Sequence, residues 1–145
     1  MSSLVSIIMN CHNAEQYLSE AIECVLSQTY NNWELIIWNN KSNDGTQEIA
    51  ESYNDPRIKI FQSKNFTTLG KARNLAIAQS RGEFIAFLDS DDIWFPEKLL
   101  TMMPRFTDQK VGICISNTIF FNKKSKKILY LRKKPPVGRV FRQLL

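Results

Sequence analysis

Long apolar runs and cysteines are scarce in this chain of 145 residues. No apolar stretch reaches the roughly 20 residues that a membrane-spanning helix needs, so a transmembrane protein is not expected. Cys11, Cys24 and Cys114 are odd in number, widely spaced and free of any C-x-x-C pattern, which gives no zinc signature and is typical of a reducing compartment. Residues 1–3 carry no positive charge, unlike the start of a signal peptide. We therefore expect a cytoplasmic protein.

Acidic residues are missing from the last quarter of the sequence. Residues 1–108 hold nine Lys or Arg and 14 Asp or Glu, a net charge of −5, whereas residues 109–145 hold ten Lys or Arg and no acid. A basic end of this kind can associate with an anionic membrane surface, and the simpler alternative is a solvated hairpin and tail. Nucleic acid is not expected as a partner, because no aromatic-bearing binding motif accompanies the charge.

What the sequence does contain is a regular alternation of strand and helix patterns. Short apolar runs predict strands at 4–9, 33–38, 57–63 and 83–88. Apolar residues at helical spacing predict helices at about 17–28, around 49–53, at about 69–82 and at about 96–106. Two later strands are expected at 111–116 and 128–132, around a Lys-rich turn. Four strand–helix repeats favour an α/β fold, with a mainly parallel sheet and helices on both faces.

A parallel sheet would bring four loops to one edge. The carboxyl ends of parallel strands share that edge, and ligands bind there, at the point where the strand order reverses. The loops expected to converge are 10–14, 39–46, 63–70 and 89–92. Three of them are rich in Asn, Ser, Thr or Asp, and Lys71 and Arg73 follow just inside the third helix. The sequence therefore predicts a polar pocket at this edge.

The fourth predicted strand ends in an acidic cluster that contains Asp89, Asp91 and Asp92. Three neighbouring carboxylates repel one another unless a cation or hydrogen bonds relieve them. Mg²⁺ or Mn²⁺ takes oxygen ligands, usually one or two carboxylates together with substrate phosphates and waters. The alternative is structural: Asp91 or Asp92 caps the helix that Pro96 opens, but a cap uses one carboxylate of the three. The cluster thus predicts a divalent-metal site that binds a diphosphate.

Two other ligand motifs are absent from the sequence. A calcium loop of the EF-hand type would need an oxygen ligand and a glycine where Ile93 and Trp94 stand. The dinucleotide fingerprint G-x-G-x-x-G is also missing after the first strand, since residues 10–15 contain no glycine. This argues against a nicotinamide-dependent oxidoreductase.

Four motifs occur in a fixed order: SQTY after the first helix, SNDGT after the second strand, ARN in the third helix and FLDSDDIW at the acidic cluster. In this combination, from Val5 to about Asn117, the chain resembles the nucleotide-sugar half of the family 2 inverting glycosyltransferases. The resemblance implies the Rossmann-like nucleotide-diphospho-sugar transferase fold of the GT-A type. It also implies sugar transfer from a nucleotide-sugar donor, a UDP-sugar above all, to a saccharide or lipid-linked acceptor, with inversion and with Mg²⁺ or Mn²⁺.

The resemblance also assigns roles to individual residues. Nucleotide binding is implied for Asn10, His12, Asn40, Lys71, Arg73 and Asp89. Asp91 is implied as a direct metal ligand, with Asp89 near the ribose or the metal. Asn40 stands where the family typically has an acid that reads the edge of the base. An Asn amide can accept a hydrogen bond from uracil N3–H and donate one to O4.

Four of these residues also have a structural alternative. His12 is then a solvated loop residue, and Asn40 is a turn former that tolerates the left-handed conformation. Arg73 pairs with an acid on the surface, and Lys71 is an exposed helix lysine.

The general base that takes the proton of the acceptor is expected beyond Leu145. In the family it lies well past the acidic cluster, where this chain has no Asp or Glu. We expect residues 1–117 to form a donor-binding domain, and residues 118–145 to form a basic hairpin and the start of an incomplete acceptor-side region. Two other functions stay open: a non-catalytic nucleotide-sugar-binding module, and a structural or interaction domain.

Overall fold

The computed structural model of the chain describes residues 3–116, 118–122 and 125–129. The chain divides into two compact units, Met1–Leu100 and Thr101–Leu145, and each is described by itself. The functional boundary expected after Asn117 stays a prediction, because compactness does not show where donor binding ends.

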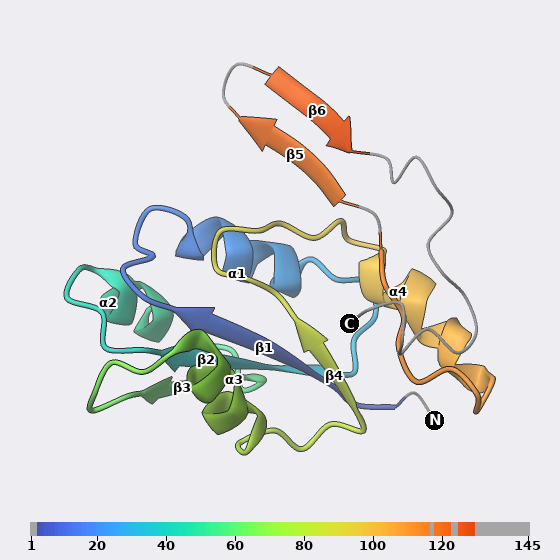
Figure 1. The fold of residues 1–145 in the computed structure, drawn as a ribbon, viewed down its shortest axis with the longest axis horizontal. Helices are drawn as coiled ribbons and strands as arrows, with labels where there is room; N and C mark the ends of the chain where they lie inside the picture. The colour runs from blue at the N-terminus through green and yellow to red at the C-terminus, as the bar shows by residue number, and fades with distance from the viewer. Residues whose placement is uncertain (1–2, 117, 123–124, 130–145) are drawn as a thin grey trace. The chain divides into compact units, whose positions relative to one another are not determined.

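The first unit is built on a four-stranded sheet in the order β3-β2-β1-β4 (Figure 1). The strands are β1 (Val5–Cys11), β2 (Trp33–Asn39), β3 (Ile58–Gln62) and β4 (Phe84–Phe87). All three pairings are parallel, which confirms the predicted sheet. The strand order reverses at β1, because β2 and β3 extend the sheet on one side and β4 on the other. The loops after β1 and β4 therefore flank the reversal point, where ligands bind in sheets of this kind.

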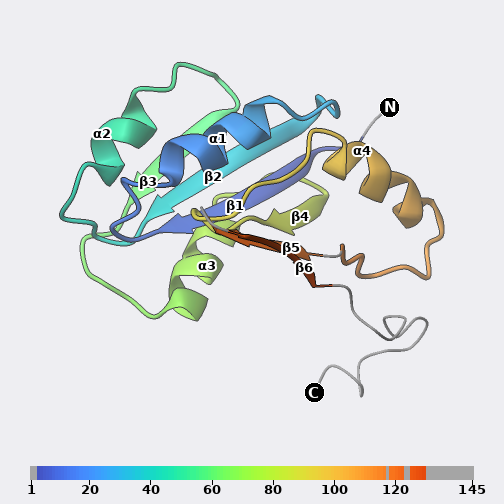
Figure 2. The same cartoon turned by 90° about the horizontal axis from the view of Figure 1, so that it is seen from above.

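Helices cover both faces of this sheet, as predicted. Figure 2 shows α1 (Leu18–Leu26) and α2 (Thr46–Glu51) on one face and α3 (Leu69–Ile77) on the other. The central strands β1 and β2 are buried almost throughout, which explains their near-continuous apolar sequences. On the α3 face, Ala72 and Ala76 pack against Ile8, Ile36 and Trp38. These two alanines allow α3 to lie close to β1 and β2.

The predicted helix at 96–106 is shorter than expected and changes type. The α-helix α4 covers Lys98–Met102, and a 3₁₀-helix, η1, follows at Met103–Thr107. Pro104 explains the change, because it has no N–H to donate to the carbonyl of Leu100 and its ring crowds that carbonyl.

The predicted strand at 111–116 is wrong. Those residues form no regular strand, and Ile113 and Ile115 are 68% and 59% exposed. Instead β5 (Thr118–Asn122) pairs antiparallel with β6 (Ser125–Leu129). An apolar run becomes a strand only when a neighbouring strand takes its backbone hydrogen bonds, and here that pairing begins later in the sequence. Residues 130–132 of the last predicted strand lie outside the described residues.

None of the helices in the described part of the chain is both long enough and apolar enough to cross a membrane. Lys123 and Lys124, in the Lys-rich turn, lie outside the described residues. Contact between the basic end and an anionic membrane surface therefore stays a prediction.

The segment after β4 is fastened to the end of α1 by the buried side chain of Gln28. Its Nε2 donates to the carbonyl oxygen of Phe95 at 2.9 Å, and its Oε1 accepts from the N–H of Leu99 at 3.1 Å. The N–H of Thr29 adds a bond to the carbonyl of Pro96 at 3.0 Å. The Gln-Thr pair of the SQTY motif thus fixes the chain immediately behind the acidic cluster.

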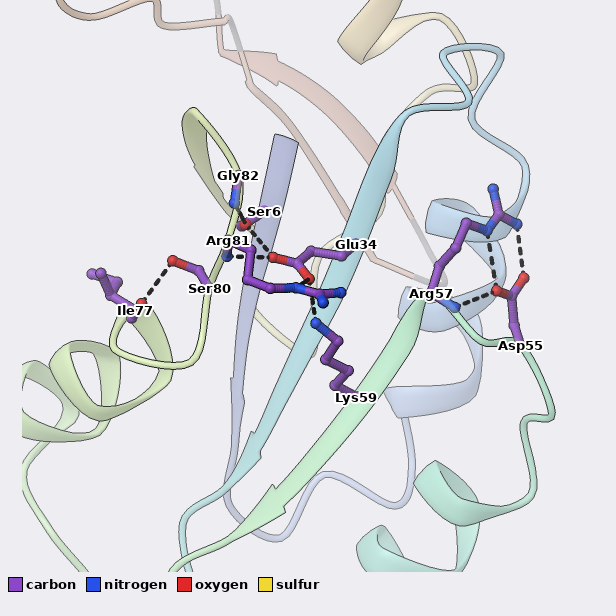
Figure 3. Close-up of polar contacts among 9 residues, drawn as sticks. All are labelled: Ser6, Glu34, Asp55, Arg57, Lys59, Ile77, Ser80, Arg81 and Gly82. Carbon is purple, nitrogen blue, oxygen red and sulfur yellow. Dashed lines mark hydrogen bonds and ion pairs between the residues drawn. The ribbon is translucent and has the colours of Figure 1, made fainter. Parts of the chain in front are cut away.

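A buried carboxylate, Glu34, lies near the amino ends of the strands, at the edge opposite their carboxyl ends (Figure 3). Its oxygens accept from Ser6 Oγ at 2.7 Å, from the N–H of Arg81 at 2.6 Å and from Lys59 Nζ at 2.6 Å. Ser6 Oγ in turn accepts from the N–H of Gly82 at 2.8 Å. A Cβ at Gly82 would lie 2.6 Å from the Ser6 nitrogen, so only glycine fits there. This cluster joins β1, β2, β3 and the turn before β4.

Burial raises the pKa of Glu34, but the hydrogen bonds from Lys59, Ser6 and the Arg81 N–H outweigh it and lower the pKa to about 2. The ordinary value is 4.5. Because the folded pKa lies below the unfolded one, the ionised carboxylate stabilises the fold fully above about pH 4.5. This contribution is lost as the pH falls from about 4.5 toward 2.

We predict that Glu34→Gln lowers the free energy of unfolding at pH 7 by about 2–4 kcal/mol, because it leaves Lys59 without its carboxylate partner. The variant should also lose stability less steeply than the wild type between pH 4.5 and 2. Urea denaturation across this range measures both effects. Glu48→Gln, at an exposed position of α2, is the matched control. An equally steep acid dependence in Glu34→Gln and the wild type would contradict this role.

We predict that Gln28→Ala lowers stability by about 1–3 kcal/mol, because the replacement leaves polar backbone groups of residues 95–99 unpaired. Hydrogen exchange at the Leu99 amide should become faster. Ser27→Ala, which removes an exposed hydroxyl on the neighbouring residue, should leave that exchange rate unchanged. Unchanged exchange at Leu99 in Gln28→Ala would show that Gln28 does not hold this segment.

Candidate functional site

The loops after β1 and β2 are joined to each other at the carboxyl edge of the sheet. Asn13 Oδ1 accepts from the N–H of Asn43 at 3.0 Å, and the N–H of Asn13 donates to Ser42 Oγ at 2.9 Å. The N–H of Ala14 donates to Thr46 Oγ1 at 2.8 Å. Asn13 has a φ of 51°, a left-handed conformation that Asn tolerates better than most residues. The SNDGT turn therefore holds the first loop in place.

Asp44 strengthens this junction. Its carboxylate accepts from the N–H groups of Glu15 and Thr46 and from Thr46 Oγ1. Burial raises the pKa of Asp44, and these hydrogen bonds outweigh it and hold the pKa below its ordinary value. The N–H of Gly45 donates to Glu15 Oε2 at 2.8 Å, so the two loops exchange contacts in both directions.

His12 and Asn40, two of the predicted nucleotide-binding residues, are in contact. His12 Nδ1 lies 3.0 Å from the carbonyl oxygen of Asn40, to which its N–H donates. The Asn40 side chain donates from Nδ2 to the carbonyl of Thr67 at 2.8 Å. Its Oδ1 accepts from the N–H and the hydroxyl of Thr67 at 3.1 and 3.0 Å. The loops after β1, β2 and β3 therefore meet here, as expected.

Asn10 lies one residue before the end of β1, opposite Trp38 of β2. Its amide nitrogen and oxygen are both buried and have no hydrogen-bond partner among the described residues. Trp38 Nε1 is also buried and has no hydrogen-bond partner among the described residues. Buried polar groups are nearly always paired, so this part of the edge holds hydrogen-bonding capacity that the fold itself does not use.

Arg73 and Asp89 form an ion pair beside the reversal point. Arg73 Nη2 donates to Asp89 Oδ1 at 2.7 Å, and the two side chains are 33% and 53% exposed. An ion pair this accessible to water contributes about 1 kcal/mol at most, so a ligand can replace it at small cost. The structure thus brings together two predicted site residues that are 16 positions apart. Lys71 is exposed in the first turn of α3 and makes no contact with the other candidate residues among the described residues.

Asp89, Asp91 and Asp92 are all exposed, yet their charges act on one another. Burial raises the pKa of Asp92, the negative charges of Asp91 and Asp89 raise it further, and Lys98 opposes them. A cation bound at these three carboxylates, called the acidic rim from here on, would relieve the repulsion. The first turn of α4, by contrast, has its Leu99 amide bonded to Gln28, so the structural alternative of an Asp cap is not needed for that amide.

The donor set suits a hard divalent cation. In the described part of the chain, no group of three or more His, Cys, Asp or Glu residues is arranged to enclose a metal. Mg²⁺ needs no such cage, because it usually takes one or two carboxylates and completes its shell with substrate phosphates and waters. Asp89 and Asp91 together provide carboxylates of that kind.

Two residues at this edge, Thr67 and Phe66, were not singled out by the sequence. Thr67 forms hydrogen bonds with Asn40, 27 positions away, a separation that no local pattern reveals. Phe66 contacts the His12 ring, with 4.7 Å between ring centroids. The signal for Phe66 was present in the sequence, since it is the single aromatic residue in the polar loop at 63–70.

Comparison with known proteins shows the family to which the chain belongs. The family model described as glycosyl transferase family 2 matches residues 6–144. The Escherichia coli UDP-Glc:alpha-D-GlcNAc-diphosphoundecaprenol beta-1,3-glucosyltransferase WfgD is 41% identical over 118 residues, covering 81% of this chain and 44% of WfgD. Glycosyltransferase GlyG of Streptococcus pneumoniae is 31% identical over 119 residues, covering 81% of this chain and 40% of GlyG. The chain thus spans less than half the length of these relatives.

Solved structures show the same fold. TarS of S. aureus, residues 1–349 in complex with UDP-GlcNAc, matches with a TM-score of 0.67 and 32% identity over 73% of this chain and 31% of that one. The mannosyltransferase PcManGT of Pyrobaculum calidifontis matches with a TM-score of 0.68 and 22% identity, over 74% of this chain and 33% of that one, a likeness of fold alone. The fold is that of the GT-A nucleotide-sugar transferases, and the chain belongs to glycosyl transferase family 2.

Proposed function

We propose that this chain provides the donor side of a glycosyltransferase and binds a UDP-sugar at the carboxyl edge of β1, β2 and β4. The observation that carries the proposal is the meeting of polar side chains there: His12 contacts Asn40, and Arg73 contacts Asp89. The relatives support the choice of donor. WfgD is named for UDP-Glc, and TarS has been solved with UDP-GlcNAc and with UDP.

The candidate residues form two groups, one at the base of the donor and one at its ribose and diphosphate. His12 and the loop held by Asn40 would receive the base, and Asn10 would use its unpaired amide there. Arg73, now bonded to Asp89, would turn to the ribose or the diphosphate. Lys71, exposed two residues earlier, would add positive charge beside the phosphates.

Asp91 is assigned as a direct ligand of Mg²⁺ or Mn²⁺, with Asp89 beside the ribose or the metal. When bound, the cation supplies positive charge that makes the departing nucleotide diphosphate a better leaving group. The acceptor hydroxyl attacks the anomeric carbon from the face opposite that leaving group, which inverts the configuration. No general base is assigned among the described residues, because the carboxylates of the rim already have donor-side roles here.

A lipid-linked acceptor is favoured over a free saccharide. The name of WfgD specifies an acceptor carried on diphosphoundecaprenol, a lipid diphosphate. A protein that meets such an acceptor works at a membrane surface. The ten Lys or Arg residues in 109–145 are suited to anionic headgroups and to the diphosphate of the lipid. This assignment is compatible with a cytoplasmic protein that associates with the membrane.

We predict that the chain binds UDP more tightly in Mn²⁺ than in EDTA, and that Asp91→Asn reduces the affinity in Mn²⁺ about tenfold or more, because it removes a charged metal ligand. Isothermal titration calorimetry measures both. Glu97→Gln, which removes the same charge from an exposed residue outside the cluster, should bind UDP as the wild type does. Equal UDP affinity with and without Mn²⁺ in the wild type would contradict the metal assignment.

The same titrations test one alternative function, because a structural or interaction domain would bind no UDP under either condition. A turnover assay tests the other. Robust release of UDP from a UDP-sugar when a lipid-diphosphate-linked saccharide is added would exclude a non-catalytic binding module, and it would also contradict the expectation that the general base lies beyond Leu145.

A further inference from the structure

Phe66 is a large apolar side chain that the core does not use. It lies in the loop between β3 and α3, and 61% of its surface is exposed. Its ring contacts His12, with a centroid separation of 4.7 Å and an angle of 57° between the planes. The two rings come from different loops and sit together at the carboxyl edge of the sheet.

Asn40 forms hydrogen bonds with His12 and with the residue next to Phe66. Its backbone carbonyl accepts the Nδ1–H of His12 at 3.0 Å, which orients the imidazole. Its side chain makes three hydrogen bonds to Thr67, the residue next to Phe66. Asn40 is itself fixed, because it is buried and its N–H donates to the carbonyl of Cys11 at 2.8 Å. One residue therefore sets the positions of two aromatic side chains.

These contacts use the side-chain amide of Asn40, which was expected to form hydrogen bonds with the edge of the base. Both acceptor positions of Asn40 Oδ1 are taken by Thr67, and one of the two Nδ2 hydrogens is used as well. The amide therefore lacks a free acceptor for uracil N3–H while it holds Thr67.

We propose that Phe66 and His12 form an aromatic wall in which the nucleobase of the donor stacks on the exposed Phe66 ring and the tilted His12 ring packs against Phe66, and that Asn40 is the positioning residue of this wall. The inference rests on the proposed donor site and names how that site binds the base. An exposed aromatic ring gives a base a π-face to stack on without reading its edge. The wall thus contributes affinity for the nucleoside, whereas Arg73 and the acidic rim act on the diphosphate.

Phe66→Ala tests the wall directly. Stacking of one base on an aromatic side chain is worth about 1–3 kcal/mol, so the Kd for UDP in Mn²⁺ should rise about tenfold. The Kd for inorganic pyrophosphate in Mn²⁺ should stay unchanged, because pyrophosphate has no base. Leu69→Ala, at a similarly exposed position (53%) three residues after Phe66, is the control and should alter neither affinity. Phe66→Trp should keep the UDP affinity.

Asn40→Asp tests the positioning role. The aspartate can still accept from Thr67, but it cannot donate to the carbonyl of Thr67 and would repel it. We expect UDP to bind more weakly and pyrophosphate to bind as before, and we expect the NMR contact between the His12 and Phe66 rings to weaken. UDP affinity equal to or greater than that of the wild type would overturn this role, since an acid that reads the base would produce that result.

The outcomes separate this inference from the proposed function. A wild-type chain that binds neither UDP nor pyrophosphate would overturn both. A wild-type chain that binds UDP, combined with unchanged UDP affinity in Phe66→Ala, would overturn the aromatic wall alone. Intermolecular NMR contacts from uracil H5 or H6 to the Phe66 ring, present in the wild type and in Leu69→Ala, would support it.

Discussion

The position of β1 between two parallel partners is the constraint on which the rest of this structure depends. β1 pairs with β2 along its whole length and with β4 along its first four residues, so three strands end at the same edge. The final residues of β1 extend beyond β4 and leave Asn10 at the reversal point. The loops that follow these strands have no regular structure, and side chains fix them to one another. The edge is therefore polar, and hydrogen bonds within the chain join its loops.

The carboxylates at the two edges of the sheet differ in burial and in hydrogen bonding. Glu34 is buried and has hydrogen-bond donors from Ser6, Lys59 and Arg81, so its charge is fully used by the fold. The carboxylates of the acidic rim are exposed and repel one another, and Arg73 compensates Asp89 only in part. This contrast supports the proposal that the carboxylates at the second edge bind a cation.

The sequence predicted the parts of the fold that depend on local pattern. Apolar runs located β1 to β4, and the strand–helix alternation led to the parallel sheet and to the meeting of loops at one edge. Features that depend on a distant partner could not be predicted. The run at 111–116 has the composition of a strand but is not paired with a neighbouring strand in the described part of the chain. Asn40 forms hydrogen bonds with Thr67 because the loop after β3 lies beside the loop after β2. The role of Asn40 was therefore inferred from the family position, and its contacts suggest a different one.

The central claim is that the carboxyl edge of this sheet binds a nucleotide diphosphate together with a divalent cation. A crystal structure of the chain with UDP and Mn²⁺, with the metal located by its anomalous signal, tests this claim most directly. The account predicts the manganese peak within coordination distance of Asp91, the diphosphate beside it and the uracil against His12 and Phe66. Manganese or UDP bound at another surface, with the acidic rim free of both, would contradict it.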